Sequence, residues 1–424
     1  SYEEAKSFIS TYNIITCGCN CMRFSVAVVA TLIAIVLISA MPALAISDSP
    51  TTRIVVGIQH GYDHAKAREQ LKMFGAVELE IPEIRAVVLT VPATAVEHIK
   101  KLPFVEYVEE DKPVRALGEV QWNIEMINAT DVWSSYGSYG DASYGYHVTV
   151  QVAIIDTGID YTHKDLQNAV TWCVVSLRNG KTFYEGYNLK NCADPNGHGT
   201  HVAGIIAARL NGFGVAGVAP KTILYAVRVL DASGSGYISD VAKGIVEAVK
   251  GPDEVSGTAD DADVISMSLG GPGSTTLYNA VKYAYQYNVT LVAAAGNEGA
   301  SSPSCPACYP EVIAVGAIDQ SYATPSWSNR NPDVVAPGVN ILSTWPNNKY
   351  AYASGTSMAC PHVSGTVALI QALRLASGKQ KLSPDEVRKV LITTAIDLGD
   401  KGYDATYGYG LVNAYAAVSQ ALSL

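Results

Sequence analysis

The chain has 424 residues, of which 48% are hydrophobic and 16% charged, a composition typical of globular proteins and unlike that of disordered or fibrous ones. It carries 29 Lys and Arg against 39 Asp and Glu, a formal net charge of −10, so it offers no broad basic surface to nucleic acid or to an anionic membrane. The length favours one large compact domain and a smaller additional segment.

A secretory signal peptide is predicted at residues 22–45. Met22-Arg23 precedes the apolar run 24–40, and Ala43-Leu44-Ala45 supplies a small-residue cleavage site. An uncleaved membrane anchor is the alternative, because the run is nearly long enough to span a bilayer. The cleavage site favours a secreted, extracellular protein without stable membrane association. Residues 1–21 do not fit this scheme and are interpreted as an upstream extension.

The segment 46–117 is predicted to be a small α+β domain. Its hydrophobic pattern gives a strand, a helix, two strands, a helix and a strand, which is the split βαβ order. These elements are expected at residues 53–58, 63–74, 76–81, 86–91, 93–102 and 105–109. A charged, proline-containing stretch at 106–113 and an exposed connector at 115–118 mark the end of this domain.

From residue 148 onward, near-continuous apolar strands alternate with amphipathic helices. Strands are expected at 148–155, 222–230, 263–269, 290–295 and 312–318, and helices near 198–210, 239–249 and 275–287. This alternation predicts an α/β domain with a mostly parallel sheet and helices on both faces. Such a sheet places its sites at the carboxyl ends of the strands. The Gly/Ser/Tyr-rich stretch 134–146 is interpreted as a surface loop.

Five cysteines follow the predicted signal peptide, and an odd number leaves at least one thiol free. Because export permits disulfides, Cys173 is predicted to pair with Cys192, and Cys305 with Cys308. A zinc site built from these four is the alternative, but only one pair has C-x-x-C spacing and no histidine lies nearby. Cys360 is expected to be a small buried residue without a chemical role.

Three residues in separate motifs have the side chains of a nucleophilic hydrolase. Asp156 ends a strand in AIIDTGID, His198 precedes a helix in NGHGTH, and Ser357 precedes a long apolar helix in SGTSMACPH, with Pro361 expected in its first turn. A serine hydroxyl needs a base to take its proton, and that base needs a carboxylate to orient it. The order Asp, His, Ser is one of three in which this triad occurs.

A possible oxyanion site accompanies the triad. Asn297 in AAAGNEG follows a strand end, where its amide could donate to a developing oxyanion, and the backbone N–H of Ser357 would be the second donor. The structural alternatives are that Asp156 caps a turn, that Ser357 only caps a helix and that Asn297 is a turn residue. His198 and His201 have metal-ligand spacing, but no third ligand motif accompanies them. His201 and His362 are therefore interpreted as structural.

The motifs together carry a resemblance to a known family. DTGID, NGHGTHVAG, GVAP, SMSLGG, AAAGNEG and SGTSMACPH stand in the order found in subtilisin-family serine proteases, including archaeal subtilisins. The resemblance covers residues 118–424 and implies a serine endopeptidase that works through an acyl-enzyme. The segment 46–117 resembles the family's propeptide, an intramolecular inhibitor and chaperone, with self-cleavage expected near Leu117-Gly118.

The resemblance also implies roles for individual residues. Asp156 matches the orienting acid, His198 the general base, Ser357 the nucleophile and Asn297 the oxyanion donor. The edges that hold a substrate strand match Ser235-Gly236 and Leu269-Gly270, and the walls of the primary specificity pocket match Ser268–Gly270 and Ala294–Gly296. The pocket floor falls near Ser304 and Cys305, where the sequence departs from the family pattern. Glycine-rich apolar walls favour large hydrophobic substrate side chains.

Calcium is the cofactor that the resemblance implies. The matching ligands are Asp165, the side chain of Asn211 and the carbonyls of Arg209, Phe213 and Val215, a hard-oxygen set that suits this ion. A family glutamine ligand falls on Gly118 and is therefore missing. The acidic loop 253–263 is interpreted either as a further calcium site or as a solvated face.

Two other functions remain as alternatives to a secreted, calcium-dependent, self-processing endopeptidase. One is an inactive binding module on a protease scaffold, because fold does not determine function. The other is a membrane-anchored ectodomain protease, which depends on whether the segment 24–45 is removed. Proteins and peptides are the expected substrates, the propeptide is the expected inhibitor, and the mature enzyme is expected to be a monomer.

Overall fold

The structure, a computed structural model, describes residues 50–111, 120–136 and 150–424. These residues form two compact units, and the division falls between Val114 and Arg115. The predicted signal peptide and the expected cleavage point at Leu117-Gly118 lie outside the described residues. No helix within the described ranges is both long enough and apolar enough to cross a bilayer.

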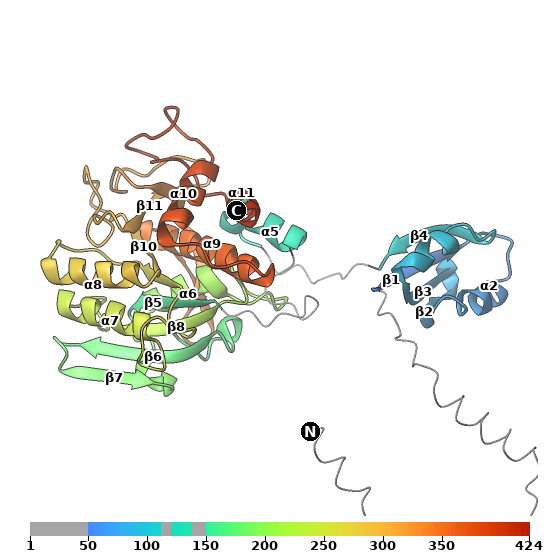
Figure 1. Ribbon diagram of the computed structural model, residues 1–424, viewed down its shortest axis with the longest axis horizontal. Coiled ribbons are helices and arrows are strands. Elements are labelled where there is room, and N and C mark those ends of the chain that lie inside the picture. The colour runs from blue at the N-terminus through green and yellow to red at the C-terminus, as the bar shows by residue number, and fades with distance from the viewer. Residues whose placement is uncertain (1–49, 112–119, 137–149) are drawn as a thin grey trace, which may run out of the picture. The chain divides into compact units, whose positions relative to one another are not determined.

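The smaller unit is an antiparallel sheet with the strand order β2-β3-β1-β4 and two short helices (Figure 1). This is the predicted split βαβ arrangement. Its elements are β1 (Thr51–Ile58), α2 (His64–Leu71), β2 (Ala76–Ile81), β3 (Ala86–Pro92), α3 (Val96–Ile99) and β4 (Val105–Glu110). Both helices contribute to one hydrophobic core with the strands, through Ala67 and Leu71 of α2 and Ile99 of α3.

Both helices of the smaller unit are shorter than the predicted ranges 63–74 and 93–102. The Asp63 side chain caps α2 by accepting hydrogen bonds from two backbone amides. After α2 the chain enters β2, which pairs with β3. Gly75 lies so close to β3 that a Cβ atom there would be 2.1 Å from the carbonyl oxygen of Thr90. In the second range a 3₁₀ turn, Ala93–Ala95, precedes α3.

Among the described residues of the larger unit, eight strands form one sheet in the order β12-β11-β10-β9-β5-β8-β6-β7 (Figure 1). They are β5 (Gln151–Asp156), β6 (Val170–Leu177), β7 (Thr182–Gly186), β8 (Ile223–Arg228), β9 (Val264–Met267), β10 (Thr290–Ala294), β11 (Val312–Ile318) and β12 (Val334–Pro337). Neighbouring strands run parallel except β6 and β7, which form an antiparallel hairpin at one edge. The predicted mostly parallel sheet is therefore confirmed.

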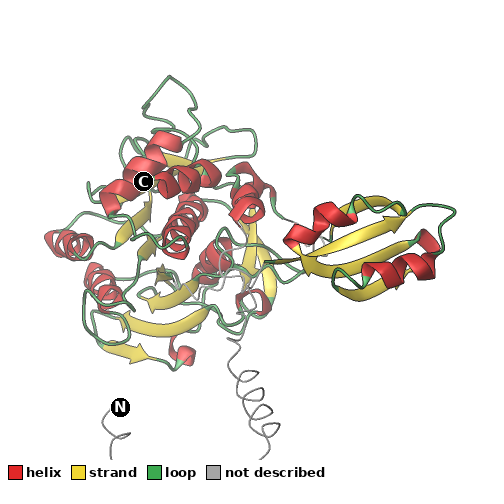
Figure 2. Cartoon of the chain, turned by 45° about the vertical axis from the view of Figure 1, so that its right-hand side comes forward, coloured by secondary structure: helices red, strands yellow, loops and turns green. Residues whose placement is uncertain are grey.

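Helices cover both faces of this sheet, as predicted (Figure 2). They are α6 (His198–Ala207), α7 (Ile238–Lys250), α8 (Thr275–Gln286), α9 (Thr356–Ala376), α10 (Pro384–Thr394) and α11 (Ala414–Ser423). Alternate residues of β5 point to opposite faces: Val152 and Ile154 pack in the core that contains α6 and α9, whereas Ala153 and Ile155 pack in the core that contains α7 and α8. A strand buried on both faces is continuously apolar, which is why the sequence pattern of β5 was clear.

Several elements lie where the sequence predicted none or a different one. The hairpin β13 (Ile341–Trp345) and β14 (Lys349–Ala353) is unpredicted, as are β6, β7, β12, α10, α11 and α4 (Trp122–Met126). The loop predicted at 134–146 is wrong at its start, because α5 (Ala129–Tyr136) extends into it. The rest of that stretch lies outside the described residues.

Helix α6 ends at Ala207, three residues before the predicted end. Ala208 has an extended backbone, and the amide of the following Arg209 donates to the carbonyl oxygen of Asp165 at 2.8 Å. A tertiary hydrogen bond to another segment thus replaces the continuation of the helix, and hydrophobic periodicity carries no signal of such a bond.

Both predicted disulfides are present, between Cys173 and Cys192 and between Cys305 and Cys308, so the zinc alternative for these four residues is wrong. Cys360 is a free, buried thiol, and burial raises its pKa to about 11.

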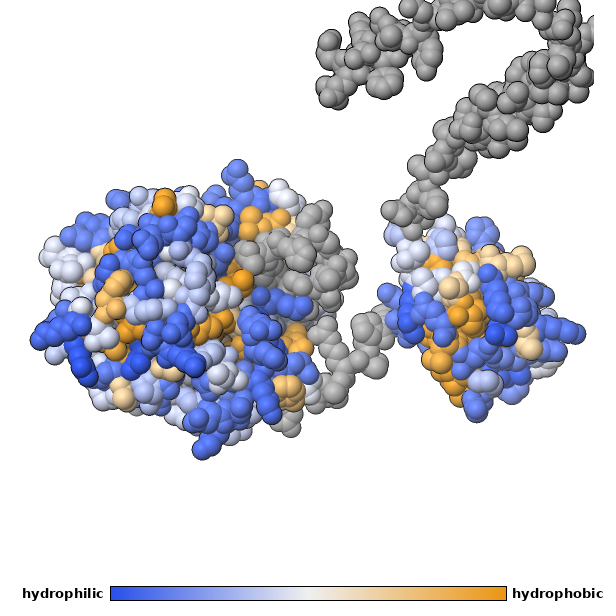
Figure 3. Space-filling model, turned by 90° about the horizontal axis from the view of Figure 1, so that it is seen from below, coloured by the Kyte–Doolittle hydropathy of each residue, from blue (hydrophilic) through white to orange (hydrophobic). Residues whose placement is uncertain are grey.

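On the face drawn in Figure 3, hydrophilic residues cover much of the larger unit, and the apolar residues among them form separate small areas.

Candidate active site

The predicted catalytic residues come together at the carboxyl edge of the central strands. Asp156 is the last residue of β5, His198 the first of α6, and Ser357 the second of α9. Asn297 follows the end of β10 by three residues. Parallel strands bring their carboxyl ends to one edge, so Asp156 at the end of β5 and Asn297 after β10 reach the same site, and the starts of α6 and α9 add His198 and Ser357.

His198 is held by the buried carboxylate of Asp156. Its Nδ1 atom lies 2.8 Å from Oδ1 and 2.9 Å from Oδ2 of Asp156. Asp156 is fully buried, whereas the His198 side chain is 29% exposed. Burial lowers the pKa of His198, but the charge and hydrogen bond of Asp156, with a smaller contribution from Asp194, outweigh burial and leave the pKa raised. The carboxylate therefore stabilises the protonated ring.

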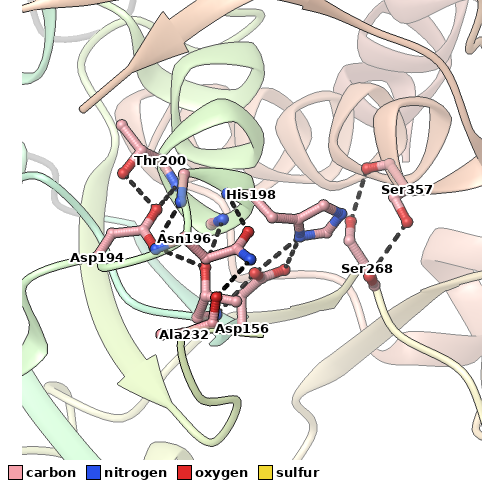
Figure 4. Close-up of polar contacts among 11 residues, drawn as sticks. Asp156, Asp194, Asn196, His198, Thr200, Ala232, Ser268 and Ser357 are labelled. Carbon is pink, nitrogen blue, oxygen red and sulfur yellow. Dashed lines mark hydrogen bonds and ion pairs between the residues drawn. The ribbon is translucent and has the colours of Figure 1, made fainter. Parts of the chain in front are cut away.

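A second carboxylate, that of Asp194, fixes the start of α6. Its Oδ1 accepts from the Thr157 hydroxyl at 2.8 Å and from the amides of Asn196 and Gly197 at 2.9 Å. Its Oδ2 accepts from the amide and hydroxyl of Thr200 at 2.9 and 2.6 Å (Figure 4). Helix N-termini present unpaired amides and favour a negative charge. Asp194 thus links the residue after Asp156 to the turn that carries His198.

Ser357 lies on the side of the His198 ring away from Asp156, next to Ser268 (Figure 4). Its hydroxyl donates to the carbonyl oxygen of Ser268 at 3.2 Å, and the Ser268 hydroxyl donates to the carbonyl oxygen of Ser357 at 2.8 Å. The second bond has a cause in the sequence. Pro361 stands four residues after Ser357, beyond the predicted first turn, and has no N–H to bond that carbonyl.

Two amide donors converge beside Ser357. The Asn297 side-chain oxygen accepts from the amide and hydroxyl of Thr356 at 2.8 and 3.0 Å, which leaves its Nδ2 group free to donate elsewhere. A Cβ atom placed on Gly355 would lie 3.5 Å from that Nδ2 and 3.6 Å from the backbone nitrogen of Ser357. The missing side chain of Gly355 therefore leaves a space that both donors border.

A cavity of about 570 Å³ extends from His198 along the surface. Its lining includes the predicted edge residues Ser235, Gly236, Leu269 and Gly270, together with Ser268. Cys305 also lines it, whereas Ala294 and Gly296, which are both buried, do not. The structure thus brings the two predicted edges to one cleft beside the histidine.

Ser304 lies between the two predicted pocket walls. A Cβ atom on Gly270 would be 3.2 Å from Cβ of Ser304, and one on Gly296 would be 2.8 Å from its Oγ. The Ser304 hydroxyl donates to the carboxylate of Glu298 at 3.3 Å, and Asn329 donates to the same carboxylate oxygen at 2.8 Å. Side chains on either glycine would fill the space between the walls.

The predicted calcium ligands also lie together. Asp165 is fully buried, and its carboxylate accepts from the Asn211 side-chain amide at 3.0 Å, the Val215 amide at 2.9 Å and the Tyr350 hydroxyl at 2.9 Å. Phe213 is exposed, and its amide donates to the Asn211 side-chain oxygen at 3.3 Å. No ion pair within the described ranges involves Asp165, so this buried carboxylate has no cationic side chain beside it.

The loop that follows α6 wraps around this carboxylate. Arg209 anchors the loop, since its guanidinium donates to the carbonyl oxygens of Asn168 and Thr222 at 3.0 and 3.2 Å. A buried carboxylate that has only hydrogen-bond donors and no cationic partner beside it is a group that a hard cation such as Ca²⁺ would neutralise, and a turn of the Asn211 amide would give the ion a second side-chain oxygen. The residues present are therefore compatible with the implied ion.

The remaining candidates have structural partners. Nε2 of His201 lies 3.0 Å from the carbonyl oxygens of Ile341 and Ala351, and Nδ1 of His362 lies 2.8 Å from that of Met358. Burial lowers the pKa of both histidines to about 4, so both are neutral. In the acidic loop, the carboxylates that lie within 4.8 Å of one another are those of Asp253, Asp260 and Asp261, and each accepts hydrogen bonds from its own loop.

The comparison with known proteins decides the family. A model described as the subtilase family matches residues 148–410. The chain belongs to the subtilase family. This subtilase is 39% identical to subtilisin E of Bacillus subtilis (strain 168) over 400 residues, which cover 91% of this chain and 96% of that protein. It is 46% identical to subtilisin DY of Bacillus licheniformis over 306 residues, 70% of this chain and 98% of that protein.

A third relative is the alkaline protease of Shouchella clausii, 42% identical over 322 residues, which cover 74% of each chain. By its family membership the present subtilase is a serine endopeptidase.

The sequence analysis did not identify the supporting residues Asp194, Thr157 and Thr356, although Asp194 stands only four residues before His198. A carboxylate that close to a helix start is a capping signal.

Proposed function

We propose that this endopeptidase cuts peptide bonds through nucleophilic attack by Ser357, with His198 as general base and Asp156 as the carboxylate that orients the ring. The pair of short contacts between His198 Nδ1 and the fully buried Asp156 carboxylate carries this proposal. A buried carboxylate in that position fixes the tautomer in which Nε2 is free to accept a proton, and it stabilises the imidazolium that forms.

The reaction begins with a change in the direction of the serine hydroxyl. In the structure this hydroxyl donates to the carbonyl oxygen of Ser268. Catalytic hydrogen bonds are often absent before substrate binds, and rotation about the Cα–Cβ bond of Ser357 turns its oxygen toward Nε2 of His198. His198 takes the proton as the oxygen attacks the substrate carbonyl, and the tetrahedral oxyanion accepts from Asn297 Nδ2 and the Ser357 amide.

His198 then donates its proton to the leaving amine, the peptide bond breaks and the acyl group stays on Ser357. Water attacks the acyl-enzyme with His198 again as base, which restores the serine. The substrate backbone lies as an extended strand between the edges Ser235-Gly236 and Leu269-Gly270. The side chain before the scissile bond, P1, enters between the walls Ser268–Gly270 and Ala294–Gly296, toward Ser304.

Calcium is proposed as a structural ion held by Asp165, the Asn211 side chain and the carbonyls of Arg209, Phe213 and Val215. A bound divalent cation would neutralise the buried carboxylate and tie the loop after α6 to the 3₁₀ turn that carries Asp165. A chelator should therefore shorten the half-life of the wild type at elevated temperature. Asp165→Ala should have the short half-life without chelator, whereas Asp400→Asn, which removes an exposed carboxylate outside the acidic loop, should behave as wild type.

The protein is further proposed to be made as a secreted zymogen, with signal peptide 22–45, propeptide 46–117 and a monomeric peptidase 118–424. The separate hydrophobic core of the smaller unit supports an autonomous propeptide. The cleaved bond is proposed to be Leu117-Gly118, with Leu117 as the apolar P1 residue. Protein and peptide substrates and the propeptide are the expected partners, with no nucleic acid and no stable membrane association after processing.

Intact-mass analysis tests the proposal directly. The full chain and its Ser357→Ala variant are incubated with calcium and their masses compared, together with hydrolysis of a casein substrate. We expect only the wild type to lose a fragment ending near Leu117 and to hydrolyse casein. Hydrolysis by Ser357→Ala would refute the assignment of the nucleophile, an uncut and inactive wild type would favour the binding-module alternative, and a mature protein that retains 24–45 would favour the membrane-anchored one.

A further inference from the structure

The disulfide between Cys305 and Cys308 lies in the wall of the cleft that holds His198. Cys305 lines the cavity. It forms an antiparallel bridge with Gly271, in which the Gly271 amide donates to the Cys305 carbonyl at 2.9 Å and the Cys305 amide to the Gly271 carbonyl at 3.1 Å. The disulfide therefore lies at the point where the segment after β10 joins the edge strand proposed to hold substrate.

The residue before the disulfide lies between the two proposed walls of the P1 pocket. Ser304 lies between Gly270 and Gly296, and its amide donates to the carbonyl oxygen of Ala295 at 2.8 Å. The turn beyond it is anchored by Tyr309, whose hydroxyl accepts from the Ser274 amide at 2.9 Å. The disulfide is thus the covalent link inside the turn that directly follows Ser304.

The two disulfides differ in their access to solvent. Cys308 is exposed and Cys305 partly exposed, whereas Cys173 and Cys192 are 0% and 1% exposed. Thiol–disulfide exchange needs a thiolate to reach one sulfur along the bond. A soluble dithiol therefore reaches the cleft disulfide in the folded protein and does not reach the other one.

We propose that the Cys305–Cys308 disulfide is a thiol-cleavable brace that fixes the P1 pocket, so that its reduction changes which P1 side chain the enzyme accepts. Two thiol sulfurs cannot stay as close as two bonded ones, so the turn 305–308 opens and Ser304 loses its fixed position. A misplacement of about 1 Å in an active site costs up to about 100-fold in rate. A large P1 side chain, which reaches Ser304, loses more than a small one.

A dithiol supplies both electrons that reduction of the Cys305–Cys308 disulfide requires. One thiolate of the reagent attacks the exposed sulfur of Cys308, the Cys305–Cys308 bond breaks and Cys305 leaves as a thiolate. The second thiol of the reagent then attacks the mixed disulfide and releases the Cys308 thiolate. The reagent is oxidised to its cyclic disulfide, and the protein pair gains two electrons and, after protonation, two hydrogens.

The test uses the active enzyme obtained from the full chain and two peptide p-nitroanilides that differ only in Phe or Ala at P1. Their kcat/KM values are measured before and after native treatment with dithiothreitol, and iodoacetamide labelling locates the reduced cysteines by mass. We expect labels on Cys305 and Cys308 and a fall of about ten-fold in the Phe/Ala ratio, in the range by which pocket fit separates substrates.

Two paired variants serve as controls. Cys305→Ser/Cys308→Ser should show the low ratio without reductant and should not respond to it. Cys173→Ala/Cys192→Ala, which removes the buried disulfide, should keep the high ratio and respond as the wild type does. An unchanged ratio in enzyme labelled at both cleft cysteines, or a wild-type ratio in the Cys305→Ser/Cys308→Ser variant, would overturn the proposal.

The inference rests on the proposed function, and the same experiment separates the two. If the untreated enzyme hydrolyses neither peptide, or if Ser357→Ala hydrolyses both, the catalytic assignment fails, and with it the role of the brace. If the untreated enzyme is active and its Phe/Ala ratio is insensitive to loss of the disulfide, only the brace fails.

Discussion

Replacing Asp194 by Asn is expected to slow peptide hydrolysis about 10- to 100-fold without unfolding the protein. The carboxylate accepts three hydrogen bonds on Oδ1 and two on Oδ2. An asparagine keeps one acceptor oxygen, which would face the three donors, so its NH₂ group would face the two donors of Thr200. The Thr200 hydroxyl can turn and accept from this NH₂ group, but the Thr200 amide can only donate. One charge-assisted hydrogen bond, about 2 kcal/mol, is therefore lost at the start of α6, and His198 then drifts from Asp156.

The same substitution should also move the pH profile. The negative charge of Asp194 contributes to the raised pKa of His198, and His198 acts as a base only when neutral. Without that charge the pKa falls, so the acidic limb of kcat/KM shifts to lower pH while the plateau rate drops. Drift of His198 away from Asp156 would lower this pKa further, so the limb moves to lower pH by both routes, and an unmoved limb would mean that neither the charge nor the position of His198 depends on Asp194.

The assay is kcat/KM for a peptide p-nitroanilide between about pH 5 and 9, the range in which histidine titrates. Circular dichroism on the same samples checks that the variant is folded. Asp253→Asn removes an exposed carboxylate that accepts a hydrogen bond from its own loop, from the Val255 amide. It should change neither the plateau nor the limb. An Asp194→Asn enzyme with a wild-type plateau and a wild-type limb would refute the positioning role of this carboxylate.

Three further changes have distinct expected outcomes. Gly355→Ala places a methyl group beside both oxyanion donors, at a backbone φ of 156° that side chains rarely adopt. We expect kcat reduced at least about 100-fold in protein that circular dichroism shows to be folded, and near-normal kcat would contradict the placement of that site. Cys173→Ala/Cys192→Ala opens a link with a sequence separation of 19 and should cost about 3 kcal/mol of unfolding free energy, measured by urea titration in the Ser357→Ala background, which prevents autolysis. Calorimetric titration should detect calcium binding to the wild type and none to the implied site in Asp165→Ala.

The sequence predicted the central sheet well because its strands are buried on both faces. Such strands are continuous apolar runs, as in Gln151–Asp156 and Val312–Ile318, and they alternate with amphipathic helices. The hairpin β13–β14 escaped prediction for the opposite reason. Its second strand, KYAYA, is largely exposed and lacks a strong hydrophobic pattern, and its pairing depends on the tertiary position of its partner.

The catalytic residues could be predicted because each stands in a motif, whereas their supporting contacts could not. The hydrogen bonds of Asp194 to Thr157 and Thr200, and the release of the Ser357 carbonyl by Pro361, depend on side-chain directions across separate elements. A motif records which residues are present, but it does not record which atoms meet. The length of α6 was overestimated for the same reason, since it is set by the hydrogen bond of the loop to Asp165.

Labelling of the nucleophile tests the central claim most directly. The enzyme is treated with an organophosphorus reagent that reacts with activated serines, and the modified residue is located by peptide mapping in the wild type and in His198→Ala. We predict one label per molecule, on Ser357, together with complete loss of peptidase activity, and no detectable label in His198→Ala. A label on another residue, or peptide hydrolysis that persists after full labelling of Ser357, would contradict the proposed mechanism.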